Sequence, residues 1–113
     1  MGAQTDQVAL TSVAERRAEV EEALKELNPE ALFLDGFEEC LVGYATQFTS
    51  LALAVYDYDD MLVKLVMDGM TGEEAVEHMS FNIEGAWSGP NTPLILHRPE
   101  REAVDWAEHA KRP

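Results

Sequence analysis

The sequence is poor in cysteine and in long apolar segments, and both shortages exclude classes of protein. Cys40 is the single cysteine among 113 residues, so no intrachain disulfide forms, and we expect a reducing compartment, the cytoplasm. Its position in an apolar run predicts a buried, inert thiol. Residues 1–10 lack the basic start and apolar centre of a signal peptide. No apolar run approaches the roughly 20 residues that cross a bilayer.

Basic residues are also scarce, and they are distributed unevenly. The chain has 22 acidic and 8 basic residues, which give a net charge of −14. Between residues 30 and 97, twelve acidic residues accompany one base, Lys64, whereas residues 98–113 are neutral overall. Nucleic-acid binding requires clustered Lys and Arg, so we expect no direct contact with nucleic acid. The same field repels anionic membranes and attracts basic protein surfaces.

Hydrophobic periodicity predicts one small α+β domain. We expect an antiparallel or mixed three-stranded sheet packed against helices, with helical extensions at both ends of the chain. Residues 1–28 form the N-terminal helix, 29–97 the compact core and 98–113 the C-terminal helix. In chain order, the expected elements are a helix over 5–27, a helical turn over 29–37, a strand hairpin over 41–49 and 51–56, helices over 57–67 and 71–86, an edge strand over 92–97 and a helix over 99–111.

Two of these helices carry clear start signals. Asp57 is a good N-cap, and Asp59 and Asp60 follow in the first turn, where the helix dipole favours carboxylates. Thr71 and Glu74 have the spacing of a capping box. The simplest interpretation of these acidic residues is therefore local, as helix caps.

The sequence predicts no catalytic, cofactor or metal site. It lacks the glycine-rich phosphate loop, the dinucleotide fingerprint, the nucleophile elbow and the paired-histidine zinc motif. Glu74 and His78 lie four residues apart on one helix face, which is typical of a surface ion pair. The acidic run from Asp57 to Asp60 fails as a calcium loop, because Met61 and Leu62 replace the required oxygen ligand and glycine.

Four blocks of sequence resemble a widespread group of small phage and prophage proteins of unknown function. They are Leu34–Ala45, Val55–Asp59, Gly69–Glu77 and Phe81–Pro93, and the resemblance covers about residues 33–96. It implies a phage or mobile-element origin, a bacterial host cytoplasm and a small α+β fold. It carries over no catalytic residue.

The leading hypothesis is an acidic protein that binds a basic surface of a macromolecule, as a phage inhibitor of a host nucleic-acid enzyme would. DNA mimicry and anti-CRISPR action are forms of it, because DNA has one charge per roughly 1.7 Å of its axis. The candidate partner-binding residues are Glu38, Glu39, Asp57, Asp59, Asp60, Glu73, Glu74, Glu77 and Trp87.

Two other functions stay open. Gly85–Pro93 is a loop rich in glycine and proline, and it could bind a small molecule or support catalysis with Asn82, Glu84 and Trp87. The commoner role of such a loop is a plain connection anchored by a buried tryptophan. Alternatively, the N-terminal helix forms a homodimer through Val20 and Leu24, as a structural or assembly protein would.

Overall fold

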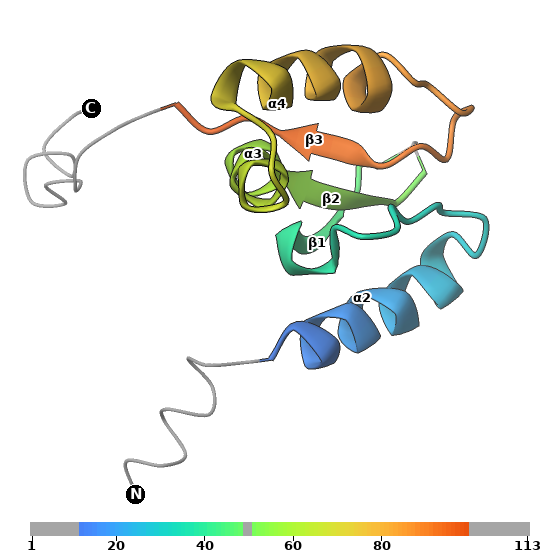
Figure 1. Ribbon diagram of the computed structural model, residues 1–113. Helices are drawn as coiled ribbons and strands as arrows, with labels where there is room; N and C mark the ends of the chain where they lie inside the picture. Colours follow the sequence, from blue (N-terminus) through green and yellow to red (C-terminus); the bar gives the residue numbers. More distant parts are fainter. Residues whose placement is uncertain (1–11, 49–50, 100–113) are drawn as a thin grey trace, which may run out of the picture.

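The computed structural model describes residues 12–48 and 51–99 and confirms a small α+β fold (Figure 1). The predicted C-terminal helix over 99–111 lies almost wholly outside the described residues, as does the predicted start of the first helix. In chain order the elements are α2 (Val13–Leu27), η1 (Glu38–Cys40), β1 (Leu41–Ala45), β2 (Leu53–Asp57), α3 (Tyr58–Met67), α4 (Gly72–His78), η2 (Met79–Glu84) and β3 (Leu94–Leu96).

The three strands form a mixed sheet in the order β1-β2-β3. β1 and β2 are the predicted hairpin and pair antiparallel, with a register shift between Leu41 and Gly43. β3 pairs parallel to β2, with Ile95 opposite Tyr56. β3 is therefore an edge strand, as the proline before it predicts, because Pro93 has no N–H to donate to a ladder.

The core lies on the helix side of the sheet. Ala54 and Tyr56 of β2 are buried against residues of α2, α3, α4 and η2, whereas Leu53 and Val55 are only partly buried. This alternation is the period-two pattern of a strand with one covered face. The core residues are Val20, Leu24, Cys40, Leu41, Ala52, Ala54, Tyr56, Met61, Leu65, Ala75 and Met79.

Two predictions about the core have clear outcomes. Cys40 is 1% exposed, which confirms a buried thiol, and this burial, with the negative charges of Asp60 and Glu39, raises its pKa to about 11. Val20 and Leu24 are buried within the same chain. These two side chains therefore cannot form the face of a homodimer, whereas dimerisation of the chain itself stays a prediction.

The predicted helix starts are confirmed by hydrogen bonds. Asp57 caps α3, because its Oδ2 accepts the N–H of Asp60 at 2.9 Å. The Thr71 hydroxyl accepts the N–H of Glu74 at 3.1 Å, and the Glu74 carboxylate accepts the N–H of Thr71 at 2.9 Å. α4 is short, so this reciprocal cap holds much of its backbone in place.

The predicted helical turn over 29–37 is wrong. Residues 31–34 form neither a helix nor a strand, and two of their N–H groups bond to distant acceptors: the N–H of Leu32 bonds to the Asn91 carbonyl at 3.1 Å and that of Leu34 to the Tyr56 hydroxyl at 2.9 Å. Buried Asn28 also connects this segment to distant residues, since its side-chain amide donates to the backbone carbonyl of Ala52 and to the side-chain oxygen of Asn91. Tertiary hydrogen bonds therefore replace the local helical ones.

The helix predicted over 71–86 changes character after His78. η2 is a π-helix, a wider turn that is uncommon and often found at functional sites. It is followed by Gly85, where an added Cβ would lie 2.9 Å from the carbonyl oxygen of Ser80. The absence of a side chain at Gly85 therefore allows the chain to leave the helix and enter the loop to β3.

Candidate partner-binding surface

The structure places the predicted partner-binding residues in two acidic groups and at two separate positions, Trp87 and Asp57. Glu38 and Glu39 in η1 lie near Asp59 and Asp60 at the start of α3, since η1 and α3 pack together. A second group, Glu73, Glu74 and Glu77, is exposed on α4. Trp87 lies in the loop after η2, and Asp57 is buried.

Asp57 does not belong to any exposed surface. Its side chain is 1% exposed, and besides capping α3 it meets Arg98, whose Nε lies 2.7 Å from Oδ1. This contact is an ion pair without hydrogen-bond alignment, because Oδ1 has no hydrogen-bond partner among the described residues. Burial raises the pKa of the Asp57 carboxyl, but the Asp60 N–H and Arg98 together outweigh burial and lower it below 3.8. The prediction that Asp57 faces a partner is thus corrected: helix capping takes it inward.

The acidic groups around η1 are partly occupied by contacts within the chain. Glu38 accepts the N–H of Gly36 at 3.3 Å and lies 3.9 Å from Arg17. Backbone hydrogen bonds at Glu38 itself and at Gly36 lower the pKa of this carboxyl. Lys64 lies on α3 and pairs with Asp68 at 3.1 Å, so it does not neutralise the predicted acidic residues by direct contact.

The outer face of α4 and η2 combines carboxylates with exposed apolar side chains, and we name it the α4 surface. Its residues are Glu73, Glu74, Val76, Glu77 and Phe81, which line one shallow depression. Phe81 is 74% exposed and Val76 about half exposed. Among the described residues, Glu73 and Glu77 form no ion pair with a basic side chain. Their negative charge therefore faces solvent.

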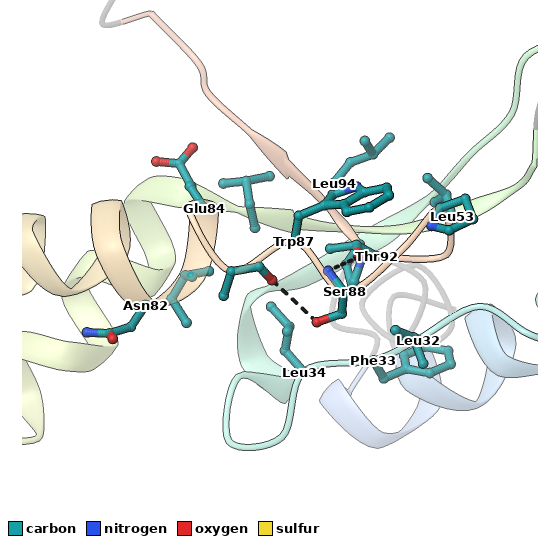
Figure 2. A pocket seen from close by; sticks show the side chains of 15 residues that line it. Leu32, Phe33, Leu34, Leu53, Asn82, Glu84, Trp87, Ser88, Thr92 and Leu94 are labelled. Carbon is teal, nitrogen blue, oxygen red and sulfur yellow. Dashed lines mark hydrogen bonds between the residues drawn. The ribbon is translucent and has the colours of Figure 1, made fainter.

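Trp87 is 73% exposed, which contradicts the plain-loop interpretation with a buried anchor. It stands at a groove of about 580 Å³ (Figure 2). The wall is mainly apolar, with polar side chains from Asn82, Glu84, Ser88 and Thr92. Such a mixture is common in binding grooves, where a few polar groups set orientation.

The loop that carries Trp87 is held by its own hydrogen bonds. The N–H of Ser88 donates to Thr92 Oγ1 at 2.8 Å, and that hydroxyl donates to the Gly89 carbonyl at 2.7 Å. Gly89 has φ of 100°, a left-handed conformation that favours glycine. The loop thus presents Trp87 on a defined turn.

The groove and the α4 surface adjoin, because Asn82 lines both the groove and a hollow shared with Glu77 and Phe81. Phe81 was missed by the sequence prediction, although a signal exists. It lies two residues from Met79 and from Ile83, which pack toward the core, so a helix places it away from them. Exposed aromatic residues and unpaired carboxylates therefore share one continuous surface.

Comparisons of the chain with protein-family models, with curated proteins and with solved structures found no match. Within residues 12–48 and 51–99, no group of three or more histidine, cysteine or acidic side chains is placed to hold a metal ion. No described helix is both long and apolar enough to span a membrane.

Proposed function

We propose that this protein binds a basic surface of another macromolecule through the α4 surface and Trp87. The observation that carries the proposal is the pairing of exposed aromatic side chains with unneutralised carboxylates. Phe81 and Trp87 are each more than 70% exposed, and Glu73 and Glu77 lie on the same continuous surface as both.

Each component of this surface has a distinct physical role in association. Aromatic side chains, tryptophan above all, often contribute most of the binding free energy at the centre of an interface. Carboxylates at the rim speed the encounter with a basic partner and exclude acidic ones. Because the charges remain in solvent, salt screens them over about 10 Å at 0.1 M ionic strength.

A nucleic-acid-binding enzyme is the partner class that we favour. Its basic groove normally binds the regularly spaced phosphates of DNA or RNA, and a protein surface with several unpaired carboxylates competes for the same cations. Inhibition of a host nuclease, including anti-CRISPR action, is the specific form of this proposal.

The test is capture of partners from a bacterial lysate by the tagged protein at about 50 and 500 mM salt. We expect a nucleic-acid enzyme that is held at low salt, released at high salt and displaced by added duplex DNA. The triple variant Glu73→Gln, Glu74→Gln, Glu77→Gln should lose this partner, and glutamine at position 74 preserves the capping box.

The matched control removes the same number of charges elsewhere. Glu19, Glu22 and Glu26 are exposed on α2, which lies next to β1, at the opposite end of the strand order from α4 (Figure 1). Changing these three to glutamine should leave capture intact. Equal loss in both triple variants would show that net charge, and not the α4 surface, determines binding, and the proposal would fail.

A second candidate is a small-molecule site in the groove, which the exposed indole and nearby polar side chains favour. Asn82 and Glu84 line the wall and offer hydrogen bonds, and Trp87 offers a stacking face. Metabolite screening by thermal shift would test it. A true ligand should raise the melting temperature independently of salt, and Trp87→Ala should abolish that rise.

A further inference from the structure

The outer edge of β3 is unpaired in the described structure. β3 pairs with β2 on one side, and no backbone hydrogen bond involves Leu94, Ile95 or Leu96 on the other side among the described residues. In an edge strand, alternate residues direct their N–H and C=O groups away from the sheet. These groups form a template on which another extended chain pairs.

The groove beside Trp87 reaches the start of β3, where Pro93, Leu94 and Ile95 line it. Leu94 and Ile95 are successive residues of β3, so their side chains point to opposite faces of the sheet. Both line the groove, so the hollow meets both faces of β3 at its first two residues. Figure 2 shows Trp87 beside Leu94 on one side of the strand, with Leu34 on the other.

The walls of the groove suit an extended segment with alternating side chains. Leu94 is about half exposed, and it offers an apolar contact together with Trp87 on one face. Leu34 and Ile83 line the other face. Buried Pro93 precedes the strand and has no N–H, so backbone pairing begins after it.

Charge identifies the kind of segment. The groove adjoins the negatively charged α4 surface through Asn82, and Glu84, which lines the groove, pairs with His97. A second copy of this chain has the same net charge of −14, so pairing between two copies is opposed by repulsion. A segment with lysine or arginine beside its apolar residues is attracted instead.

We propose that the edge of β3 accepts an extended, basic and partly apolar segment of the partner as a fourth strand of the sheet. This is β-strand addition, in which backbone hydrogen bonds supply affinity and alternate side-chain contacts supply specificity. The inference rests on the proposed function, since it names the part of the basic partner that the groove and edge hold.

The experiment titrates the full chain with a synthetic peptide of alternating lysine and valine, acetylated and amidated at its ends. Trp106→Phe makes Trp87 the only tryptophan, so its fluorescence reports on the groove. We expect a saturable blue shift at low salt. Leu94→Lys should weaken binding at least about tenfold, because it adds a like charge opposite the peptide. Met67→Lys, at an exposed site on α3, should change binding less than about twofold.

Backbone pairing is tested with N-methylated peptides, in which either the valine or the lysine amides are blocked. A peptide strand pairs through one of its two edges, so we expect one methylated form to lose binding and the other to keep it. Absence of binding by the parent peptide, retention by both methylated forms, or loss by both overturns strand addition.

Failure of strand addition can be distinguished from failure of the proposed function. If strand addition fails while the lysate partner is still captured in a salt-sensitive manner that depends on the α4 surface, the partner docks on α4 without the β3 edge. If capture does not depend on the α4 surface but the peptide still pairs with β3, the edge site stands and the α4 surface is not its partner-binding element.

Discussion

Acidic side chains stand at the start of both α3 and α4, and the two groups are held in different ways. At α3, Asp57 turns inward, caps the helix and pairs with Arg98 at 2.7 Å. At α4, the threonine Thr71 is the cap, and it leaves the carboxylates of Glu73 and Glu77 in solvent. The aspartate that caps α3 is thus used within the fold, whereas the threonine that caps α4 carries no charge.

The sequence alone does not distinguish buried, paired Asp57 from exposed, unpaired Glu73 and Glu77, but the structure does. A carboxylate that is buried and paired contributes to stability, because its removal leaves backbone donors and a cation without their partner. An exposed, unpaired carboxylate contributes little to stability and slightly opposes folding through repulsion. We therefore expect substitution of Asp57 to act on folding and substitution of Glu73 or Glu77 to act on binding.

The largest stability effect is expected for Asp57→Ala. Loss of an N-cap costs up to about 2 kcal/mol, and here the Arg98 contact is lost as well. The free energy of unfolding, measured by urea denaturation, should fall by about 2 kcal/mol or more. Asp59→Ala is the control, because Asp59 is exposed in the same turn, and a change below about 0.5 kcal/mol is expected. Equal effects would mean that Asp57 is not a buried cap.

A smaller loss is expected for Thr71→Ala, which removes the exposed cap of α4. N-cap substitutions by alanine cost typically about 1 kcal/mol. Thr71→Ser keeps the hydroxyl and should restore nearly all of the stability. If alanine and serine behave alike, the hydroxyl contact with the Glu74 N–H does not hold α4, and the comparison between the two caps loses its basis.

The pH dependence of stability should distinguish the two helix starts further. The folded-state pKa of Asp57 is lowered below its ordinary 3.8, so its stabilising contribution is fully present above that value and lost as pH falls through the folded pKa. Asp57→Asn retains a capping side chain but cannot titrate. The stability difference between wild type and this variant should therefore be larger at neutral pH than at about pH 2. A pH-independent difference would contradict the lowered pKa.

The smallest stability effect is expected on the α4 surface. Glu73→Gln and Glu77→Gln should change the free energy of unfolding by less than about 0.5 kcal/mol, as surface substitutions generally do. Urea denaturation of the double variant checks this. A loss of more than about 1 kcal/mol in the free energy of unfolding would show that these carboxylates stabilise the fold, which would contradict a role in binding alone.

Local signals predicted the hairpin, the caps at Asp57 and Thr71 and the edge position of β3. The missed features depend on contacts between residues far apart in the chain. The N–H of Leu34 donates to the hydroxyl of Tyr56, 22 residues away, and the side-chain amide of Asn28 donates to the side-chain oxygen of Asn91, 63 residues away. No periodicity in the sequence encodes such pairs, and local signals alone predict a helical turn over residues 29–37.

The candidate surface was predictable only in part. Counting acidic residues identified Glu73, Glu74 and Glu77 correctly as exposed, but it could not separate them from buried Asp57. The exposure of Trp87 depends on the π-helix and on the Ser88–Thr92 hydrogen bond, which hold the loop outward. Neither feature has a reliable sequence signature, because both depend on how the loop meets the rest of the fold.

The most direct test of the central claim is the salt dependence of affinity for the captured partner. Dissociation constants would be measured for wild type and for the Glu73, Glu74, Glu77 glutamine variant between about 50 and 500 mM salt. The account predicts that wild-type affinity falls at least about tenfold over this range and that the variant binds more weakly with a shallower dependence. An identical dependence in both proteins would contradict the assignment of binding to the α4 surface.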